Sequence, residues 1–215
     1  MFRVQSMTSE NIRRALEPVI GADEPLNSVL AAILDRCREQ DSITFKEIAD
    51  QAPDDAQEII LLAWDWKLLI PRRSRQSAEW DDRIMRFEAG ERFEMVNIVK
   101  SLLALAAERG AWDLAAAVQS LYGRMGEPAF ERMPSLIQEM AKRVRYQSIS
   151  GAAIHLACVR TGFQDRTGAM IAILKGGGVI SPRLMSSNPS ERIGSPLYEM
   201  HPLVLKLSAK EPNAA

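Results

Sequence analysis

Apolar residues recur along most of this chain at the spacing of one face of an α-helix. In residues 26–37 they follow the i, i+3, i+4, i+7, i+8 pattern, which predicts a core-facing helix that ends near Gln40. Residues 8–20 show similar spacing behind Thr8 and Ser9, which are favourable residues for a helix N-terminus. The chain is therefore expected to begin with a leading helix and a second, buried helix.

Two shorter helices are expected next. Thr44 and Glu47 have the spacing of a capping box, in which the hydroxyl and the carboxylate each bind a free backbone N–H at a helix start. That short helix stops at Pro53, because proline lacks a backbone N–H. Asp54 then caps a third helix, which runs to about Lys67.

An alternating pattern follows the third helix and predicts a β-hairpin. Residues 68–73 have the composition of a strand, residues 74–82 are mostly polar, and residues 83–88 alternate again between apolar and polar side chains. We therefore expect a hairpin with a long loop and a return strand at residues 83–88.

The same order of elements begins again at Pro134. Residues 134–147 predict a helix with this proline in its first turn. Ser148 or Ser150 caps a second helix, and Gly162 ends that helix with a residue suited to the left-handed cap.

The second copy also ends in a predicted hairpin. Asp165 opens its third helix, which runs to Gly176, and residues 179–184 form a strand directly afterwards. Residues 186–194 are rich in turn-forming residues, and residues 196–202 form the return strand. Repetition of a whole element order is stronger evidence for a fold than any one element.

Three helices followed by a hairpin is the order of the winged helix-turn-helix superfamily, and both copies resemble it. The resemblance rests on the short second helix, the turn at Pro53, the third helix that runs straight into a strand, and the return strand. It implies a mainly α fold with small β-hairpin wings, an α+β protein. The predicted parts are a leading helix (1–24), a first unit (25–93), a helical hairpin (94–133), a second unit (134–207) and a flexible tail (208–215).

The segment between the two copies predicts a pair of helices. Residues 93–109 and 111–124 carry apolar stripes on either side of Gly110, and so short a turn makes the helices antiparallel. The broad stripe of the first helix fits an inert spacer buried between the units, or the contact surface of a homodimer. The spacer is the favoured interpretation.

Composition excludes several classes of protein. The 215 residues are 47% hydrophobic and 26% charged, which is ordinary for a globular chain. The apolar runs are far shorter than the roughly 20 residues that cross a bilayer, and the N-terminus lacks the features of a secretory signal. Cys37 and Cys158 lie among apolar residues at helical spacing, where reduced core thiols are expected. We therefore expect a cytoplasmic protein without a membrane partner.

Charge is distributed unevenly between the two copies. Residues 1–93 contain 13 Lys and Arg against 18 Asp and Glu, whereas residues 134–215 contain 10 against 5. The C-terminal copy is therefore basic, and electrostatics favours the binding of a polyanion there.

Residues suited to catalysis or metal binding are few. His155 lies among apolar helical residues without the partners of a zinc-binding helix, so a core or boundary position is expected. His201 has no sequence link to a nucleophile. The glycines at positions 176–178 follow a helix and precede a strand, the reverse of a phosphate-binding loop, and predict a helix cap. We predict no enzyme activity, no metal and no cofactor.

The resemblance also implies that the third helix enters the major groove of DNA and that the wing contacts the backbone. In the first copy this helix is acidic, with carboxylates at four positions opposed by Lys67 alone. The carboxylates are Asp54, Asp55, Glu58 and Asp65. The adjoining strand and wing supply a secondary basic set, Arg72, Arg73 and Arg75, for which a solvated surface or a protein-docking site is the alternative.

The second copy is the better candidate for nucleic acid. Base-reading residues are expected at the start of its third helix, and phosphate contacts along the helix and wing. The predicted set is Gln164, Arg166, Thr167, Lys175, Arg183 and Arg192. The outward positions Gly168 and Ala172 offer few donors for base edges, which fits either loose, phosphate-dominated binding or packing against a protein.

Trp80 is an aromatic residue in the first wing. It can contact a partner or fold back over its own hairpin. The leading hypothesis is a non-enzymatic protein that either binds nucleic acid, with duplex DNA favoured, or regulates transcription, and that uses its C-terminal unit. The alternative is a protein-interaction or scaffold subunit that uses winged helices as docking platforms, with partners or a second copy bound at the first unit or the helical hairpin.

Overall fold

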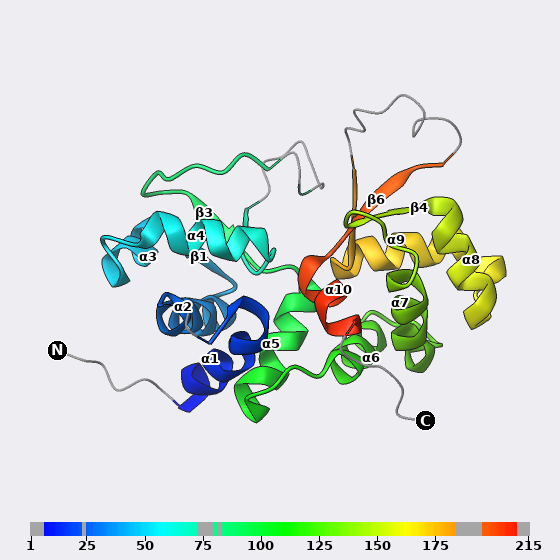
Figure 1. Ribbon diagram of the computed structural model, residues 1–215, viewed down its shortest axis with the longest axis horizontal. Helices are drawn as coiled ribbons and strands as arrows, with labels where there is room; N and C mark the ends of the chain where they lie inside the picture. The colour runs from blue at the N-terminus through cyan, green and yellow to red at the C-terminus, as the bar shows by residue number, and fades with distance from the viewer. Residues whose placement is uncertain (1–6, 23–24, 73–79, 81–82, 184–194, 210–215) are drawn as a thin grey trace. The chain divides into compact units, whose positions relative to one another are not determined.

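The computed structural model describes residues 7–22, 25–72, 80, 83–183 and 195–209 (Figure 1). Contacts divide the chain into two compact units. Unit 1 comprises Met1–Arg75 and Arg83–Asp113, and unit 2 comprises Gln76–Asp82 and Leu114–Ala215. Each unit has its own buried apolar core and its own small sheet.

Unit 1 packs three long helices against two short ones and a sheet. In chain order its described elements are α1 (Met7–Ile20), α2 (Asn27–Gln40), β1 (Ser42–Thr44), α3 (Phe45–Gln51), α4 (Ala56–Asp65), β2 (Ile70–Pro71), β3 (Arg92–Glu94) and α5 (Asn97–Arg109). α1 packs against α2 and α5, and α2 also contacts α5. The predicted leading helix and core-facing helix are both confirmed.

The sheet of unit 1 has β3 as its central strand, and its strand β1 contacts α2 and α3. The strand order is β1-β3-β2, and all pairs are antiparallel. Phe93 of β3 lies opposite Ile43 of β1 and Pro71 of β2, and Phe93 and Ile43 are fully buried. Strands this short are not stable alone, so the sheet depends on burying these side chains against the helices.

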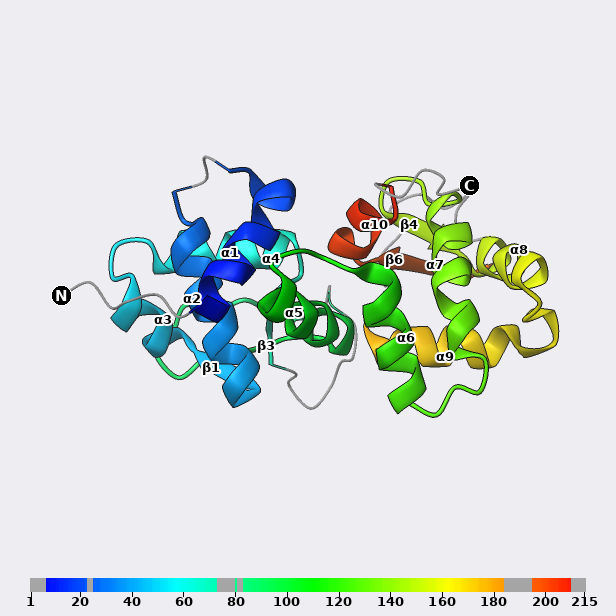
Figure 2. The same cartoon turned by 90° about the horizontal axis from the view of Figure 1, so that it is seen from below.

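Unit 2 repeats this plan, with two 3₁₀ turns added among its described elements. Its described elements are α6 (Leu114–Arg124), the 3₁₀ turn η1 (Phe130–Arg132), α7 (Met133–Ala141), β4 (Ser148–Ser150), α8 (Gly151–Thr161), the 3₁₀ turn η2 (Gln164–Arg166), α9 (Thr167–Gly177), β5 (Ile180–Pro182), β6 (Leu197–Met200) and α10 (Pro202–Ser208). α7 packs against α6 and α8, and α8 packs against α9 (Figure 2). The sheet order is β4-β6-β5.

The two units share one topology. In each, the order is helix, strand, helix, helix, strand, strand, and the last strand lies in the middle of the sheet. The repeat predicted from the sequence is therefore confirmed at the level of element order. The fold is mainly helical with two small antiparallel sheets among the described residues.

Several predicted helix ends are confirmed. Thr44 accepts a hydrogen bond from the N–H of Glu47, and the Glu47 carboxylate accepts one from the N–H of Thr44, which completes the capping box. Ser150 caps α8 through the N–H of Ala153. Gly162 ends α8 in the left-handed conformation, at φ 73°.

The predicted return strand of the first hairpin is wrong. Residues 83–88 form no strand, and Ile84 is exposed, whereas β3 lies later and buries Phe93. Residues 83–88 thus alternate in sequence, but most of their side chains are exposed and they have no regular structure. Asp54 does not cap α4, because the N-cap position is occupied by Asp55, whose side chain makes no capping hydrogen bond. Both first strands, β1 and β4, were not predicted, since each is only three residues long.

The expected helical hairpin at residues 94–133 is not a separate part of the molecule. α5 packs within unit 1 against α1 and α2, and α6 packs within unit 2 against α7 and η1. The boundary between the units falls at Asp113 and Leu114. The predicted helix at residues 134–147 also ends earlier, at Ala141, and α10 replaces part of the expected return strand and tail.

Among the described residues, no helix combines the length and the apolar character that a membrane crossing requires.

Candidate interaction surfaces

The predicted nucleic-acid residues of unit 2 lie in η2, in α9 and after β5. Gln164 and Arg166 belong to η2, Thr167 begins α9, and Lys175 lies near its end. Arg183 follows β5. All of these except Thr167, which is half-buried, are exposed, whereas the predicted Arg192 lies outside the described residues. The predicted start of the third helix at Asp165 is instead the 3₁₀ turn η2.

Arg166 is engaged in an ion pair rather than presented to solvent alone. Its Nη1 and Nη2 atoms donate to the two carboxylate oxygens of Glu127, at 2.9 and 2.8 Å. The Glu127 side chain is only 2% exposed and also accepts the N–H of Ala129. The hydrogen bonds from Arg166 are the main cause that lowers the pKa of Glu127. Arg166 therefore neutralises a buried carboxylate and fixes the loop before η1 to η2.

Thr167 is also occupied by local bonds. Its hydroxyl donates to the carbonyl of Gln164 at 3.1 Å and lies 2.9 Å from Nδ1 of His155. His155 is exposed on α8, so the core or boundary position expected for it is wrong. Cys37 and Cys158 are buried free thiols, as predicted. The glycine run ends α9 as expected, with Gly178 as the left-handed cap.

The outer surfaces of α8 and α9 present aliphatic side chains beside a few polar ones, which on α8 are His155 and Arg160. On α8, Leu156 is 56% exposed and Val159 is 47% exposed. On α9, the exposed positions Ala169 and Ala172 precede Lys175, the one exposed cation of that helix. This surface, which we call the α8/α9 face, offers contact area and few hydrogen-bond donors.

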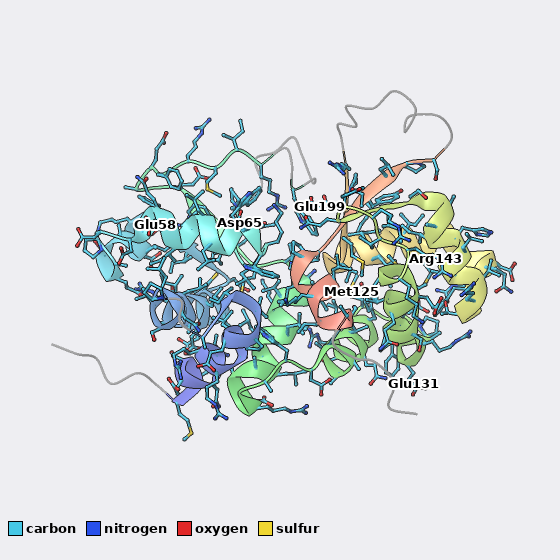
Figure 3. All side chains as sticks on the ribbon, viewed as in Figure 1. Glu58, Asp65, Met125, Glu131, Arg143 and Glu199 are labelled. Atoms are coloured by element: carbon cyan, nitrogen blue, oxygen red, sulfur yellow. The ribbon has the colours of Figure 1, made fainter. Side chains whose placement is uncertain are left out.

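The corresponding helix of unit 1 is acidic. Glu58 and Asp65 are exposed on α4 (Figure 3), and Leu61 between them is 48% exposed. Lys67, the expected compensating cation, is buried with its ammonium 3.7 Å from the centre of the Trp64 ring. We call these exposed α4 residues the α4 face. Its charge repels phosphate, and its aliphatic centre favours contact with protein.

The secondary basic set of unit 1 is described only in part. Arg72 is exposed and lies 3.9 Å from the carboxylate of Glu94. Arg83 also binds Glu94, at 2.9 Å, so this carboxylate is shared by two arginines. Arg73 and Arg75 lie outside the described residues.

Trp80 is part of unit 2 and is buried there. Its backbone N–H donates to Ser181 Oγ at 3.0 Å, and its ring meets that of His201 edge-on, with ring centres 5.5 Å apart. Only 3% of its surface is exposed. Trp80 is therefore neither an exposed anchor nor folded over the first hairpin, because its partners are residues of the second sheet and its neighbouring helix.

Two polar features were not predicted from the sequence. Glu127 stands 39 positions before the arginine that it binds, and a local pattern carries no signal for such a pair. Tyr146 is almost fully exposed in a turn between α7 and β4, where the sequence predicted helix. Among the described residues no group of His, Cys, Asp and Glu is arranged to hold a metal ion.

These features define a two-unit helical protein with repeated topology and exposed helix faces. The chain belongs to one protein family of uncharacterised function, whose sequence profile matches residues 10–211, nearly the whole length. Comparison with curated proteins gives no match, and comparison with solved structures gives none.

Proposed function

We propose that both units are winged helices and that the chain is a non-enzymatic module that binds other proteins. The element order and the β1-β3-β2 and β4-β6-β5 sheet orders support the winged-helix assignment. In that assignment α4 and α9 are the third helices, which face DNA in DNA-binding members of the superfamily.

One observation carries the choice of protein over DNA. In both units, the outer surface of the second or third helix presents aliphatic side chains where a DNA reader would present donors. Leu61 is exposed between carboxylates on α4, and Leu156 and Val159 are exposed on α8. Arg166, the most favourably placed cation, is bound to buried Glu127. Aliphatic contact area with few charges is the composition of a protein interface core.

Affinity capture from native cells, quantified by mass spectrometry, tests this proposal. We expect L156E or L61K to reduce at least one retained protein tenfold or more, because each change puts a charge into an apolar contact. The matched control is I84E, since Ile84 is an aliphatic residue that is even more exposed, at 72%, but lies outside both faces. Equal retention by the wild type and all three variants, with unchanged thermal unfolding, would overturn the proposal.

Duplex DNA is the second candidate ligand, favoured by Lys175 and Arg183, which are two of the exposed cations of unit 2. Fluorescence anisotropy with a labelled random duplex at low salt distinguishes it. This candidate requires salt-dependent binding that weakens about tenfold in K175E or R183E, because each removes a phosphate contact. K206E is the control, since Lys206 is an exposed cation on α10. Absence of binding at tens of micromolar protein excludes duplex DNA.

A further inference from the structure

The segment before the first strand of the repeat has a different conformation in each unit. In unit 1, α2 continues to Gln40, and Asp41 alone connects it to β1. In unit 2, the equivalent α7 ends at Ala141, and residues 142–147 connect it to β4. Residues 27–41 and 133–147 are equally long, so unit 2 has a turn where unit 1 continues its helix.

Residues 142–147 lead into a tight, strained turn, which we call the tyrosine turn (residues 145–148). The N–H of Arg145 donates to the carbonyl of Ser148 at 2.9 Å, and the N–H of Ser148 donates back at 2.8 Å. Between them, Tyr146 and Gln147 have φ of 50° and 61°. Two successive left-handed residues are usually glycine or asparagine, because a larger side chain is disfavoured there. Strain of this kind is retained mainly where a side chain has a task.

The turn is fixed to the sheet and presents one aromatic ring. The carbonyl of Gln147 accepts the N–H of Met200 at 2.8 Å, which ties the turn to β6. Tyr146 is 97% exposed at its tip. Both faces of its ring are therefore accessible to a ligand.

Two arginine side chains are associated with the tyrosine turn. Arg145 is exposed next to the tyrosine, and Arg183 reaches across from the end of β5 to donate to Ser148 Oγ. Glu199 of β6 lies opposite Ser148 in the sheet register and is half-buried. Two arginines against one glutamate leave the turn positively charged.

We propose that the tyrosine turn binds single-stranded nucleic acid. The Tyr146 ring stacks on one base, and Arg145 and Arg183 contact the phosphates on either side. A rigid exposed ring with flanking cations is the combination that binds unpaired bases. An aromatic anchor of a protein interface is instead set among apolar residues, whereas the exposed neighbours of Tyr146 in the turn, Arg145 and Gln147, are polar.

This site shares no residue with the α4 face or the α8/α9 face and does not depend on the proposed protein binding. The test uses the full chain, fluorescence anisotropy and a labelled 15-nucleotide mixed sequence as single-stranded DNA, as single-stranded RNA and as duplex DNA. We expect either single strand to bind at least tenfold more tightly than the duplex, with an affinity that falls as salt rises.

The variant Y146G distinguishes a loss of nucleic-acid binding from a loss of protein stability. Y146G removes the stacking ring and also relieves the left-handed strain, so binding is expected to fall at least tenfold while the thermal midpoint stays equal or rises. Y146W is expected to retain binding. R145Q and R183Q are each expected to weaken binding several-fold and to flatten its salt dependence, whereas R109Q, at an exposed arginine of α5 in unit 1, leaves both unchanged.

Three outcomes would overturn the proposal. They are no binding of either single strand by the wild type, equal binding by Y146G, and binding of a labelled oligoglutamate peptide that requires Tyr146 and exceeds binding of the single strands. L156E should leave single-strand binding unchanged, so failure of the protein-binding proposal is measured separately.

Discussion

Tyr122 on α6 carries a buried hydroxyl for which the described residues provide no hydrogen-bond partner. Burial alone raises the pKa of this phenol above its ordinary value, so the side chain is neutral in the folded protein. The hydroxyl also faces Gly177 of α9, where an added Cβ would lie only 2.6 Å from it. Gly177 is therefore required for space, not for backbone conformation.

This contact predicts a rescue between two substitutions. G177A is expected to lower the free energy of unfolding by about 1–3 kcal/mol through overpacking, although alanine favours a helix. Y122F removes the colliding oxygen, which has no partner to lose among the described residues, so the double variant should recover most of that stability. Urea unfolding of the four proteins checks this, and strictly additive effects would contradict it.

The ion pair of Glu127 and Arg166 predicts a pH dependence. A carboxyl whose pKa is lowered by folding stabilises the protein above its unfolded pKa of about 4.3, and that contribution is lost as pH falls through the folded pKa. E127Q is expected to cost about 1–3 kcal/mol at pH 7, because a charged hydrogen bond is lost and Arg166 is left without its carboxylate. The difference in the free energy of unfolding between E127Q and the wild type should become smaller below pH 4.

Urea unfolding between pH 3 and pH 7 measures this effect. E131Q is the control, since Glu131 is exposed in η1 near the same loop (Figure 3) and should change stability little at any pH. A constant difference between the wild type and E127Q across this range would show that the carboxylate charge has no role.

At the scale of elements, the second helices of the two repeats begin differently. α3 has a complete capping box, whereas the third residue of α8 is Ala153, which offers no carboxylate. T44A is expected to destabilise unit 1 by about 1 kcal/mol, and T44A and E47A together should cost less than the sum of the two, because each breaks the same box. S150A should cost about 1 kcal/mol in unit 2.

Circular dichroism and hydrogen exchange locate these losses in α3 and α8 respectively. T44S, which keeps the hydroxyl, serves as the control for the first unit. Full additivity of T44A and E47A would contradict the reciprocal geometry seen in the structure.

Local signals explain which elements were predictable. The capping box at Thr44, the cap at Ser150 and the glycine at position 162 act on their own neighbours, so their positions follow from the sequence. Alternation at residues 83–88 did not predict a strand correctly, because exposed extended chain has the same period as a strand. The residue that decides the sheet register is Phe93, which is buried by partners far away in the chain.

The candidate sites depended even more on long-range contacts. Sequence reasoning placed Arg166 at the start of a third helix, but its role is set by Glu127, and Tyr146 was assigned to a helix that ends at Ala141. Neither fact has a local signature. The charge difference between the two copies was visible in composition, but the exposed leucines of α4 and α8 were not.

For the whole molecule, the course of the chain is the distinctive feature. Trp80 belongs to unit 2, whereas the described residues before it, up to Arg72, and those after it, from Arg83 to Asp113, belong to unit 1. Trp80 is buried against His201 and bonded to Ser181.

Removal of the Trp80 side chain is expected to destabilise unit 2 by about 3–5 kcal/mol, since a buried aromatic leaves a cavity. The backbone bond to Ser181 does not depend on the side chain, so W80F should retain much of the stability. Hydrogen exchange should quicken in β5 and α10 of W80A. Equal quickening in α1 and α2 would contradict the assignment of Trp80 to unit 2.

The position of Trp80 also sets an order of events during synthesis. Trp80 is synthesised 101 residues before Ser181, which takes roughly 5–20 s at ordinary elongation rates. His201 is synthesised later still. During that time the rest of unit 1, up to Asp113, is synthesised and leaves the ribosome. The residues that bury the tryptophan have not yet been made. The last helix of unit 2 must emerge before this aromatic side chain is covered, so the nascent chain has a defined period in which it depends on protection from aggregation.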